Sequence, residues 1–297
     1  MLLRNSFFYT AGLAFLGLAK AKNMLQGYSS PKPFDMSEID RCVEYDINVV
    51  DEWVSFLHRY TQNQDALKDK TVLELGPGSD LGAGLYLLSK GCYQYNSCDV
   101  NSLVTSSPNE FYQKLFDRLK TIDSQADTHF LQAQLDAVKA GKSSRLNYVV
   151  RDDFDIVAAF GKETVDIVFS QAAFEHFDDI DATVAQLSAV CKADATLVIE
   201  VDLKTHSRWI TAKDPNNIYR YSDAIYNLFK FRGIPNRMRP YQYIDALKRC
   251  GWEDIELHGI SQQSESHDSY SGMNQRFQDS KNQMEYLSII ICARRVP

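Results

Sequence analysis

The stretch that decides the fold is Thr71-Val-Leu-Glu-Leu-Gly-Pro-Gly-Ser-Asp80, an apolar run that leads into a glycine-rich turn. The run at 71–75 suits a buried parallel strand, because such strands are covered on both faces and read as nearly continuous apolar sequence. Gly76 and Gly78 carry no Cβ atom, so the backbone can approach a ligand closely where this strand ends. Residues 81–90 are expected to form the following helix. The strand, the glycine turn and the helix together predict a ligand site in a doubly wound α/β domain.

An acidic residue at the end of the next strand adds a second contact to this site. Asp99 follows the run Tyr93 to Cys98 and can accept hydrogen bonds from both hydroxyls of a ribose. The third glycine of a dinucleotide fingerprint is absent, since its position holds Leu81, which disfavours a pyrophosphate. Glu74 places a carboxylate at the mouth of the first strand, where it repels a phosphate and attracts the ammonium group of a methionine moiety. These residues predict S-adenosylmethionine as the cofactor.

The pattern resembles the class I methyltransferases, whose first motif is an acidic residue, an apolar residue and a glycine-rich turn. The resemblance implies a Rossmann-like α/β fold with a seven-stranded, mostly parallel sheet and an antiparallel C-terminal strand. The alternative is a tight strand-to-helix turn in another doubly wound domain. Within the resemblance, the cofactor-binding residues are Glu74, Gly76, Pro77, Gly78, Asp99, Val100, Asp152, Asp153, Phe154, Ser170 and Gln171.

Two of these assignments have an open alternative. An acid after the third strand lies near the adenine amino group in the family and an adjacent aromatic ring covers the base, which gives these roles to Asp152 or Asp153 and to Phe154. The same residues also suit a helix cap and a core phenylalanine. Both interpretations place them directly after the strand expected at 146–150.

Charge and cysteine content restrict the class of protein. The chain has 297 residues and a net charge of −7, and its Lys and Arg residues form no long run, so nucleic acid is not an expected partner. The six cysteines are scattered without a CxxC pair, which fits neither a zinc site nor a disulfide framework and favours reduced thiols in a cytoplasmic protein. No metal ligand is assigned from the sequence.

The first 30 residues are expected to form an apolar helix. The run Phe7 to Ala19 is too short to span a bilayer, and Lys20 and Lys22 follow it. We reject an export signal, because the chain downstream has the pattern of a cytoplasmic cofactor enzyme. The helix is expected to pack on the rest of the protein, and a weak contact with a membrane surface is the alternative.

The remaining chain divides into a helical extension at 31–69 and a methyltransferase domain at 70–297. A Ser/Pro linker at 29–33 precedes the extension, in which apolar residues from Val43 to Leu57 recur at helical spacing. Arg41 and Tyr45 share one face of that helix and can reach the cofactor carboxylate, but a solvated surface pair is the simpler interpretation, so neither is assigned to the site.

The C-terminal part of the domain is expected to carry a cap and two final strands. The cap is an insertion at about 204–243. Strands at 254–257 and 286–293 are joined without a helix and should pair antiparallel, and the polar segment Ser261 to Asp279 between them is expected to be a mobile loop.

Two histidines follow the fourth and fifth predicted strands, where such sheets bind ligands. His206 stands four residues after Asp202, so the acid can orient the imidazole as a general base. An alcohol profits from such a base, because its proton must leave as it attacks the methyl group. His176, in a Glu-His pair that recurs in the family, is the second candidate at the rim of the site. The alternatives are a solvated loop histidine and a capping or core histidine.

The insertion from Trp209 to Tyr243 is rich in Tyr and Arg, which combine stacking with forked hydrogen-bond donation and suit sugars or anions. Its Arg-Tyr-Ser-Asp and Asn-Arg-x-Arg motifs resemble bacterial methyltransferases associated with glycan synthesis. The acceptor-binding candidates are Arg220, Tyr221, Arg237 and Arg239. Alternatively, these arginines pair with acids of the chain and the tyrosines only pack.

The sequence therefore predicts an S-adenosylmethionine-dependent methyltransferase that methylates a hydroxyl of a sugar or glycan. A first alternative is N- or C-methylation of a small molecule or lipid-linked metabolite, for which no strong base is required. A second alternative is a non-catalytic donor-binding scaffold, against which the intact run from Glu74 to Gly78 argues.

Overall fold

The computed structural model describes residues 2–27, 37–102, 104, 107–142, 144–264 and 270–296, and the linker expected at 29–33 lies outside this part. Within it, seven strands form one sheet in the order β3-β2-β1-β4-β5-β7-β6. β7 runs antiparallel to both of its neighbours, β5 and β6, and the other described strand pairs are parallel, which confirms the expected Rossmann-like fold with an antiparallel C-terminal strand. The strands are β1 (Thr71–Leu75), β2 (Gln94–Asp99), β3 (Leu146–Val150), β4 (Val165–Gln171), β5 (Cys191–Asp202), β6 (Trp252–Gln262) and β7 (Tyr286–Arg295).

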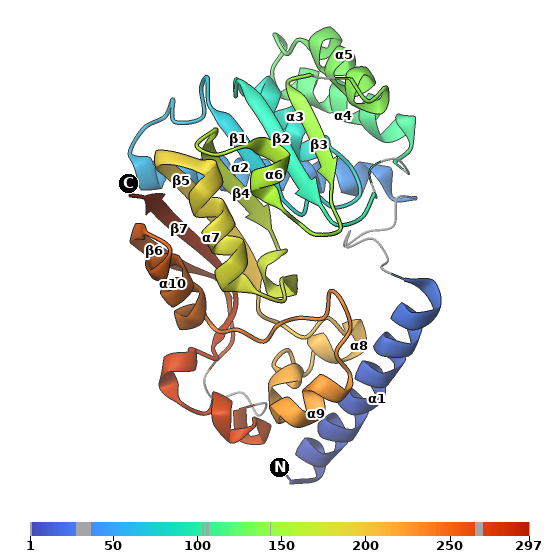
Figure 1. Ribbon diagram of the computed structural model, residues 1–297. Helices are drawn as coiled ribbons and strands as arrows, with labels where there is room; N and C mark the ends of the chain where they lie inside the picture. The colour runs from blue at the N-terminus through green and yellow to red at the C-terminus, as the bar shows by residue number, and fades with distance from the viewer. Residues whose placement is uncertain are drawn as a thin grey trace.

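Helices cover both faces of the sheet and enclose two cores (Figure 1). Successive residues of β1 alternate between them, since Val72 belongs to one core and Leu73 to the other. Trp53 of α2 stacks on Phe169 of β4 at 4.9 Å, so the helical extension is part of the domain core. One face carries α2 (Ile39–Thr61), α3 (Gly82–Ser89), α4 (Asn109–Ile122) and α5 (Thr128–Lys139); the other carries α6 (Ile156–Phe160), α7 (Ile180–Val190) and α10 (Pro240–Arg249).

A smaller cap with its own apolar core lies beyond the carboxyl ends of the parallel strands (Figure 1). It includes α8 (Arg208–Thr211), η3 (Asn217–Arg220), α9 (Asp223–Leu228) and three short helices, η4 (Tyr270–Gly272), η5 (Gln275–Phe277) and η6 (Ser280–Asn282). Met273 and Phe277 are buried in this core. Of the segment 261–279 that was expected to be a mobile loop, residues 261–262 end β6 and residues 265–269 lie outside the described part. Residues 270–279 are a packed part of the cap, because Tyr270, Met273 and Phe277 pack into its core.

The N-terminal helix α1 (Leu2–Gln26) packs along the cap, as expected (Figure 1). Asn217 donates to the Phe8 carbonyl at 3.0 Å, and the Tyr221 hydroxyl donates to the Tyr9 carbonyl at 3.0 Å. Gly12 permits this approach, since a Cβ there would lie 2.0 Å from the Asn217 and Tyr221 oxygens. Among the described helices, none has both the length and the apolar character to cross a membrane.

The four residues expected to bind the acceptor are buried inside the cap and its junction with the sheet. Arg220 donates to both carboxylate oxygens of Asp214, at 2.7 and 3.2 Å. The Arg237 guanidinium donates to the Tyr221 carbonyl at 2.8 Å and lies over the Tyr226 ring. None of the four is among the residues that line the large pocket described below. Their geometry argues for a structural role and against the one expected from sequence, because their donors are already used within the chain.

Of the four residues, Arg239 shows this structural role most clearly. Its side chain is fully buried, and its guanidinium donates to the carbonyls of Asn282 at 2.9 Å, Gln283 at 2.7 Å and Tyr286 at 3.0 Å. It also donates to the Tyr219 hydroxyl at 3.1 Å. One arginine therefore ties the cap to the start of β7.

Replacing Arg239 with Met should lower the free energy of unfolding by about 3–5 kcal/mol, because the buried carbonyls lose their donor. Urea unfolding followed by circular dichroism measures it. Arg249→Met is the matched control: that arginine pairs with Asp181 at the surface, both side chains being more than half exposed, so its loss should cost under about 1 kcal/mol. Unchanged stability of Arg239→Met with a raised KM for the acceptor would restore the acceptor-binding role.

Candidate active site

A cavity of about 400 Å³ opens at the carboxyl ends of β1, β2 and β4. This is where the strand order reverses and where open α/β sheets bind ligands. Of the residues expected to bind the cofactor, those that line it are Glu74, Gly76, Pro77, Gly78, Asp99, Val100, Asp152, Asp153, Phe154 and Gln171. Ser170 lies close to the cavity but does not line it, because its buried hydroxyl donates to the Leu75 carbonyl at 3.0 Å.

The glycine turn has the backbone that only glycine adopts easily. Gly76 and Gly78 have φ values of 71° and 79°, in the left-handed region. A Cβ on Gly76 would lie 2.8 Å from the Cβ of Ala173, in the loop after β4. The turn after β1 therefore packs directly against the loop after β4 and forms one wall of the cavity with it.

Two buried acids of the cavity are held by hydrogen bonds within the chain. Glu74 accepts a hydrogen bond from the Tyr95 hydroxyl at 2.5 Å. Asp99 accepts from the Asn101 backbone N–H at 2.9 Å. Burial raises the pKa of Asp99, and the N–H groups of Asn101 and Val100 oppose that rise. Fixed carboxylates at these two strand ends can accept hydrogen bonds from an ammonium group and from ribose hydroxyls.

The structure adds residues to the cavity that the sequence interpretation missed or set aside. Tyr45 and Asp46 of α2 line it, and burial raises the pKa of Tyr45, so its hydroxyl is neutral. Arg232 and Gly233 of the cap line it as well, and Arg232 donates to the Asp152 carbonyl at 2.8 Å. The helical spacing of Tyr45 was a usable signal, whereas no local pattern marked Arg232.

The cavity suits a cationic ligand. Its acidic lining residues are Asp46, Glu74, Asp99, Asp152, Asp153, Asp178 and Asp179, and its one arginine is Arg232. Such an excess of carboxylates attracts the sulfonium and ammonium groups of S-adenosylmethionine and repels a pyrophosphate. Phe154, which packs on Phe177 at 5.1 Å, offers a flat apolar wall for a base. The residues that line the cavity thus fit S-adenosylmethionine, the expected cofactor.

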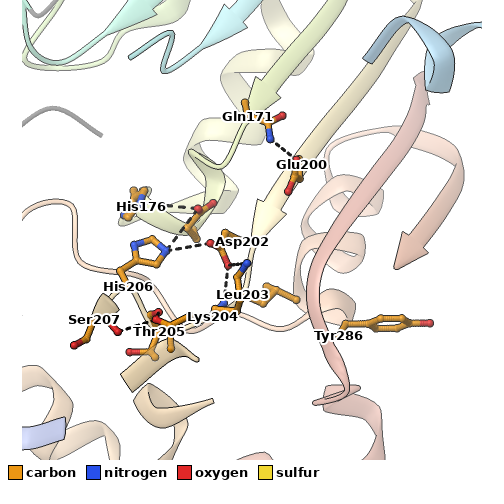
Figure 2. A network of polar contacts seen from close by, with 12 residues as sticks. Gln171, His176, Glu200, Asp202, Leu203, Lys204, Thr205, His206, Ser207 and Tyr286 are labelled. Carbon is orange, nitrogen blue, oxygen red and sulfur yellow. Dashed lines mark hydrogen bonds and ion pairs between the residues drawn. The ribbon is translucent and has the colours of Figure 1, made fainter. Parts of the chain in front are cut away.

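Two histidines and two carboxylates meet beside this cavity, after β4 and β5 (Figure 2). The His176 and His206 rings meet edge to face at 4.8 Å, and His176 lines the cavity. His206 Nε2 lies 3.8 Å from Asp202 Oδ2 and 4.0 Å from Glu175 Oε1. The structure therefore brings together the three residues expected for proton transfer and adds Glu175, which the sequence interpretation treated only as part of a Glu-His motif.

The environment of this cluster shifts its titrating groups. Burial, reinforced by the Asp202 carboxylate, raises the pKa of Glu175 well above its ordinary value. Burial lowers the pKa of His176 to about 4. Partial burial, with the nearby Lys204 charge, also lowers the pKa of His206. Both imidazoles are therefore neutral at pH 7, and each presents a lone pair.

Asn236 of the cap fixes the backbone that carries Glu175 and His176. Its N–H donates to the Glu175 carbonyl at 2.6 Å, and its side-chain amide donates to the Phe174 carbonyl at 2.9 Å. The Tyr243 hydroxyl in turn donates to the Asn236 side chain at 3.0 Å. The Asn-Arg-x-Arg motif seen in the sequence thus contributes to the site by positioning it.

Comparison with known families agrees with this geometry. Residues 124–199, from α5 to β5, match the sequence model of a family described as a methyltransferase domain. Over this stretch the chain is similar to a methyltransferase domain, and the residues that line the cavity fit S-adenosylmethionine. No curated protein sequence matches the chain.

Solved structures with a similar fold share little sequence with it. A putative S-adenosylmethionine-dependent methyltransferase from Listeria monocytogenes has 16% identity and a TM-score of 0.45, over 81% of this chain and 97% of that chain. A phosphoethanolamine N-methyltransferase from Haemonchus contortus has 15% identity and a TM-score of 0.46, over 90% of this chain and 61% of that chain. A putative sarcosine dimethylglycine methyltransferase from Galdieria sulphuraria has 14% identity and a TM-score of 0.46, over 84% and 86%.

Asp99→Ala and Gly78→Val should both weaken binding of S-adenosylhomocysteine in calorimetry. The first loses charge-assisted hydrogen bonds to the ribose, worth about 1.5–3 kcal/mol, and the second fills the turn and strains its backbone. Asp123→Ala is the matched control, since Asp123 makes the same turn bond, to the Gln125 N–H at 2.9 Å, outside the cavity lining. Wild-type affinity in both site variants would contradict the assigned pocket.

Proposed function

We propose that this chain is an S-adenosylmethionine-dependent methyltransferase and that it acts on a hydroxyl oxygen of a small-molecule acceptor. The observation that carries the proposal is the cluster of neutral imidazoles and carboxylates beside the donor cavity. An alcohol is a poor nucleophile unless its proton is removed as it attacks. N-methylation of a neutral amine needs no such base, so it would not use this cluster.

His206 is suited to accept the proton. Its side chain is 35% exposed at the edge of the cluster, so an acceptor entering from solvent can reach it. The imidazolium formed by proton transfer would lie 3.8 Å from Asp202, which orients the ring and stabilises the positive charge. S-adenosylmethionine supplies an electrophilic methyl group when bound, and the protein's contribution is to align the hydroxyl and to take its proton.

The prediction of a sugar or glycan acceptor has lost its main support, because the arginines that favoured it make hydrogen bonds within the cap. The acceptor class is therefore defined by the base alone, as an alcohol. Sugars belong to that class and are the first acceptors to screen.

The exposed face of α1 supports a second proposal, which concerns location. Its exposed large apolar residues are Leu2, Leu3, Phe7, Leu18, Met24 and Leu25. The helix carries Arg4, Lys20 and Lys22 and no acidic residue, although the whole chain is acidic. Arg4 and Lys20 donate to carbonyls of the cap, and Lys22 is exposed. An exposed apolar helix face without acidic residues suits the interface of an anionic membrane. We infer that α1 brings the enzyme to such a surface.

Binding to vesicles should depend on this face. The double variant Leu3→Glu/Phe7→Glu should lose sedimentation with phosphatidylserine vesicles, because charge is placed where apolar contact is needed. Ile122→Glu on α4, an exposed apolar residue of another helix, is the control and should bind as wild type. Equal sedimentation of the wild type with neutral and with anionic vesicles would contradict the proposal. Equal sedimentation of the wild type, the double variant and Ile122→Glu with anionic vesicles would contradict it as well.

His206→Ala should reduce kcat on an alcohol acceptor by about 10²–10⁴-fold with little change in donor affinity. Asp202→Asn should reduce it less, because Asp202 only orients the ring. Since the pKa of His206 is lowered, the acidic limb of the kcat/KM profile should lie below pH 6.5, and activity should be flat above it. His258→Ala is the control, because His258 forms a similar pair with Glu256, 3.1 Å away, on β6. A His206→Ala enzyme with wild-type kcat would place the base elsewhere.

A further inference from the structure

We propose that Glu175, His176 and His206, together with Asp202, bind a divalent first-row transition-metal ion, with Zn²⁺ and Mn²⁺ as the closest matches to the ligand types. No metal ligand was expected from the sequence, because the chain has no CxxC pair and these residues lie in separate segments, after β4 and at the end of β5. The catalytic role of this ion rests on the proposed O-methylation, whereas its binding does not.

The geometry is close to that of a loaded site. One ligand atom from each of Glu175, His176 and His206 lies within 4.8 Å of the others. Glu175 Oε1 is 3.9 Å from His176 Nε2 and 4.0 Å from His206 Nε2, and Asp202 Oδ2 is 3.8 Å from the latter atom. Neighbouring ligand atoms of a tetrahedral zinc ion are about 3.4 Å apart. Small side-chain rotations therefore suffice to close the site.

The charge balance of the cluster calls for a cation. Glu175 is buried, its Oε1 lies within 4.0 Å of Nε2 of both His176 and His206, and neither of its carboxyl oxygens has a hydrogen-bond partner of good geometry. Burying a carboxyl group that has no partner is unfavourable. Glu200 and Asp202 are the other acids close to Glu175, His176 Nδ1 also has no hydrogen-bond partner, and Lys204 lies 3.6 Å from Asp202. A bound dication satisfies Glu175 and both imidazole lone pairs at once.

The ligand types select the kind of metal. Imidazole nitrogen with carboxylate oxygen is the set preferred by zinc, manganese, iron and cobalt, whereas magnesium and calcium prefer oxygen ligands alone. His206 is the most exposed of the three residues grouped in the cluster, so the site opens on that side and leaves a position for a ligand from solvent. The hydrogen bonds of Asn236 hold the Glu175–His176 turn and supply the outer support that such sites require.

An ion at this place would serve the hydroxyl acceptor of the proposed function. A transition-metal dication lowers the pKa of an oxygen bound to it, which assists removal of the hydroxyl proton beside the donor cavity. In the metal-loaded enzyme His206 would be a ligand and the hydroxyl proton would leave to solvent on its exposed side, whereas in the metal-free enzyme His206 takes that proton.

Titration of untagged, chelator-stripped protein with Co²⁺, followed by visible d–d absorption and by displacement with Zn²⁺, tests the site directly. We expect one equivalent to bind to the wild type. His206→Ala and the isosteric Glu175→Gln should each weaken binding by at least about 100-fold. His258→Ala should bind as wild type, since its histidine–glutamate pair lies on β6. A Zn²⁺-induced rise in melting temperature that His206→Ala loses is a second readout.

No binding to the wild type, or equal binding in both site variants, would overturn the metal site. Calorimetry with S-adenosylhomocysteine and methyl transfer to an alcohol in the presence of chelator separate this result from the proposed function. Full turnover in stripped protein that binds no Co²⁺ would remove the metal and keep O-methylation. One bound equivalent with no methylation of any alcohol would keep the metal site and remove the proposed acceptor class.

Discussion

The contact between the turn after β1 and the loop after β4 is the constraint on which the site depends. Gly76 can have no side chain, because a Cβ there would meet Ala173 at 2.8 Å. This contact places the backbone of both loops in the wall of one cavity, with Gly78 on one side and His176 on the other. In the proposed function, the methyl donor and the groups that act on the acceptor are held by these two adjacent strands of the sheet. Precise positioning of this kind is the main source of rate in a displacement reaction.

The cap supports this arrangement from outside. Asn236 binds the backbone of the turn after β4, and Arg239 binds the carbonyls that lead into β7. α1 packs on the cap through backbone carbonyls that Asn217 and Tyr221 reach only because residue 12 is glycine. The arginines that suggested a sugar site make hydrogen bonds within the cap, and Asn236 of the same segment supports the turn that carries His176.

An excess of negative charge is common to the cavity and to the histidine cluster. Acidic residues outnumber basic residues in the cavity lining, and Glu175 and Asp202 are the acidic residues of the cluster. Both places therefore attract cations, the donor in the first and, by our inference, a metal ion in the second. The lowered pKa values of the two histidines follow from the same enclosure and keep their lone pairs available.

The sequence by itself determined the sheet and most of the donor-binding edge. Buried strands such as β1 and β4 are continuous apolar runs, and a glycine turn followed by Asp99 is a local pattern, so both can be recognised without tertiary contacts. Tertiary structure alone decided the roles of the polar residues beyond β4. Arg239 and its partners in 282–286 are more than forty residues apart, and Glu175 meets His206 only through the pairing of β4 with β5. The type of a residue states which interactions it can make, whereas burial and long-range neighbours decide which of them it makes.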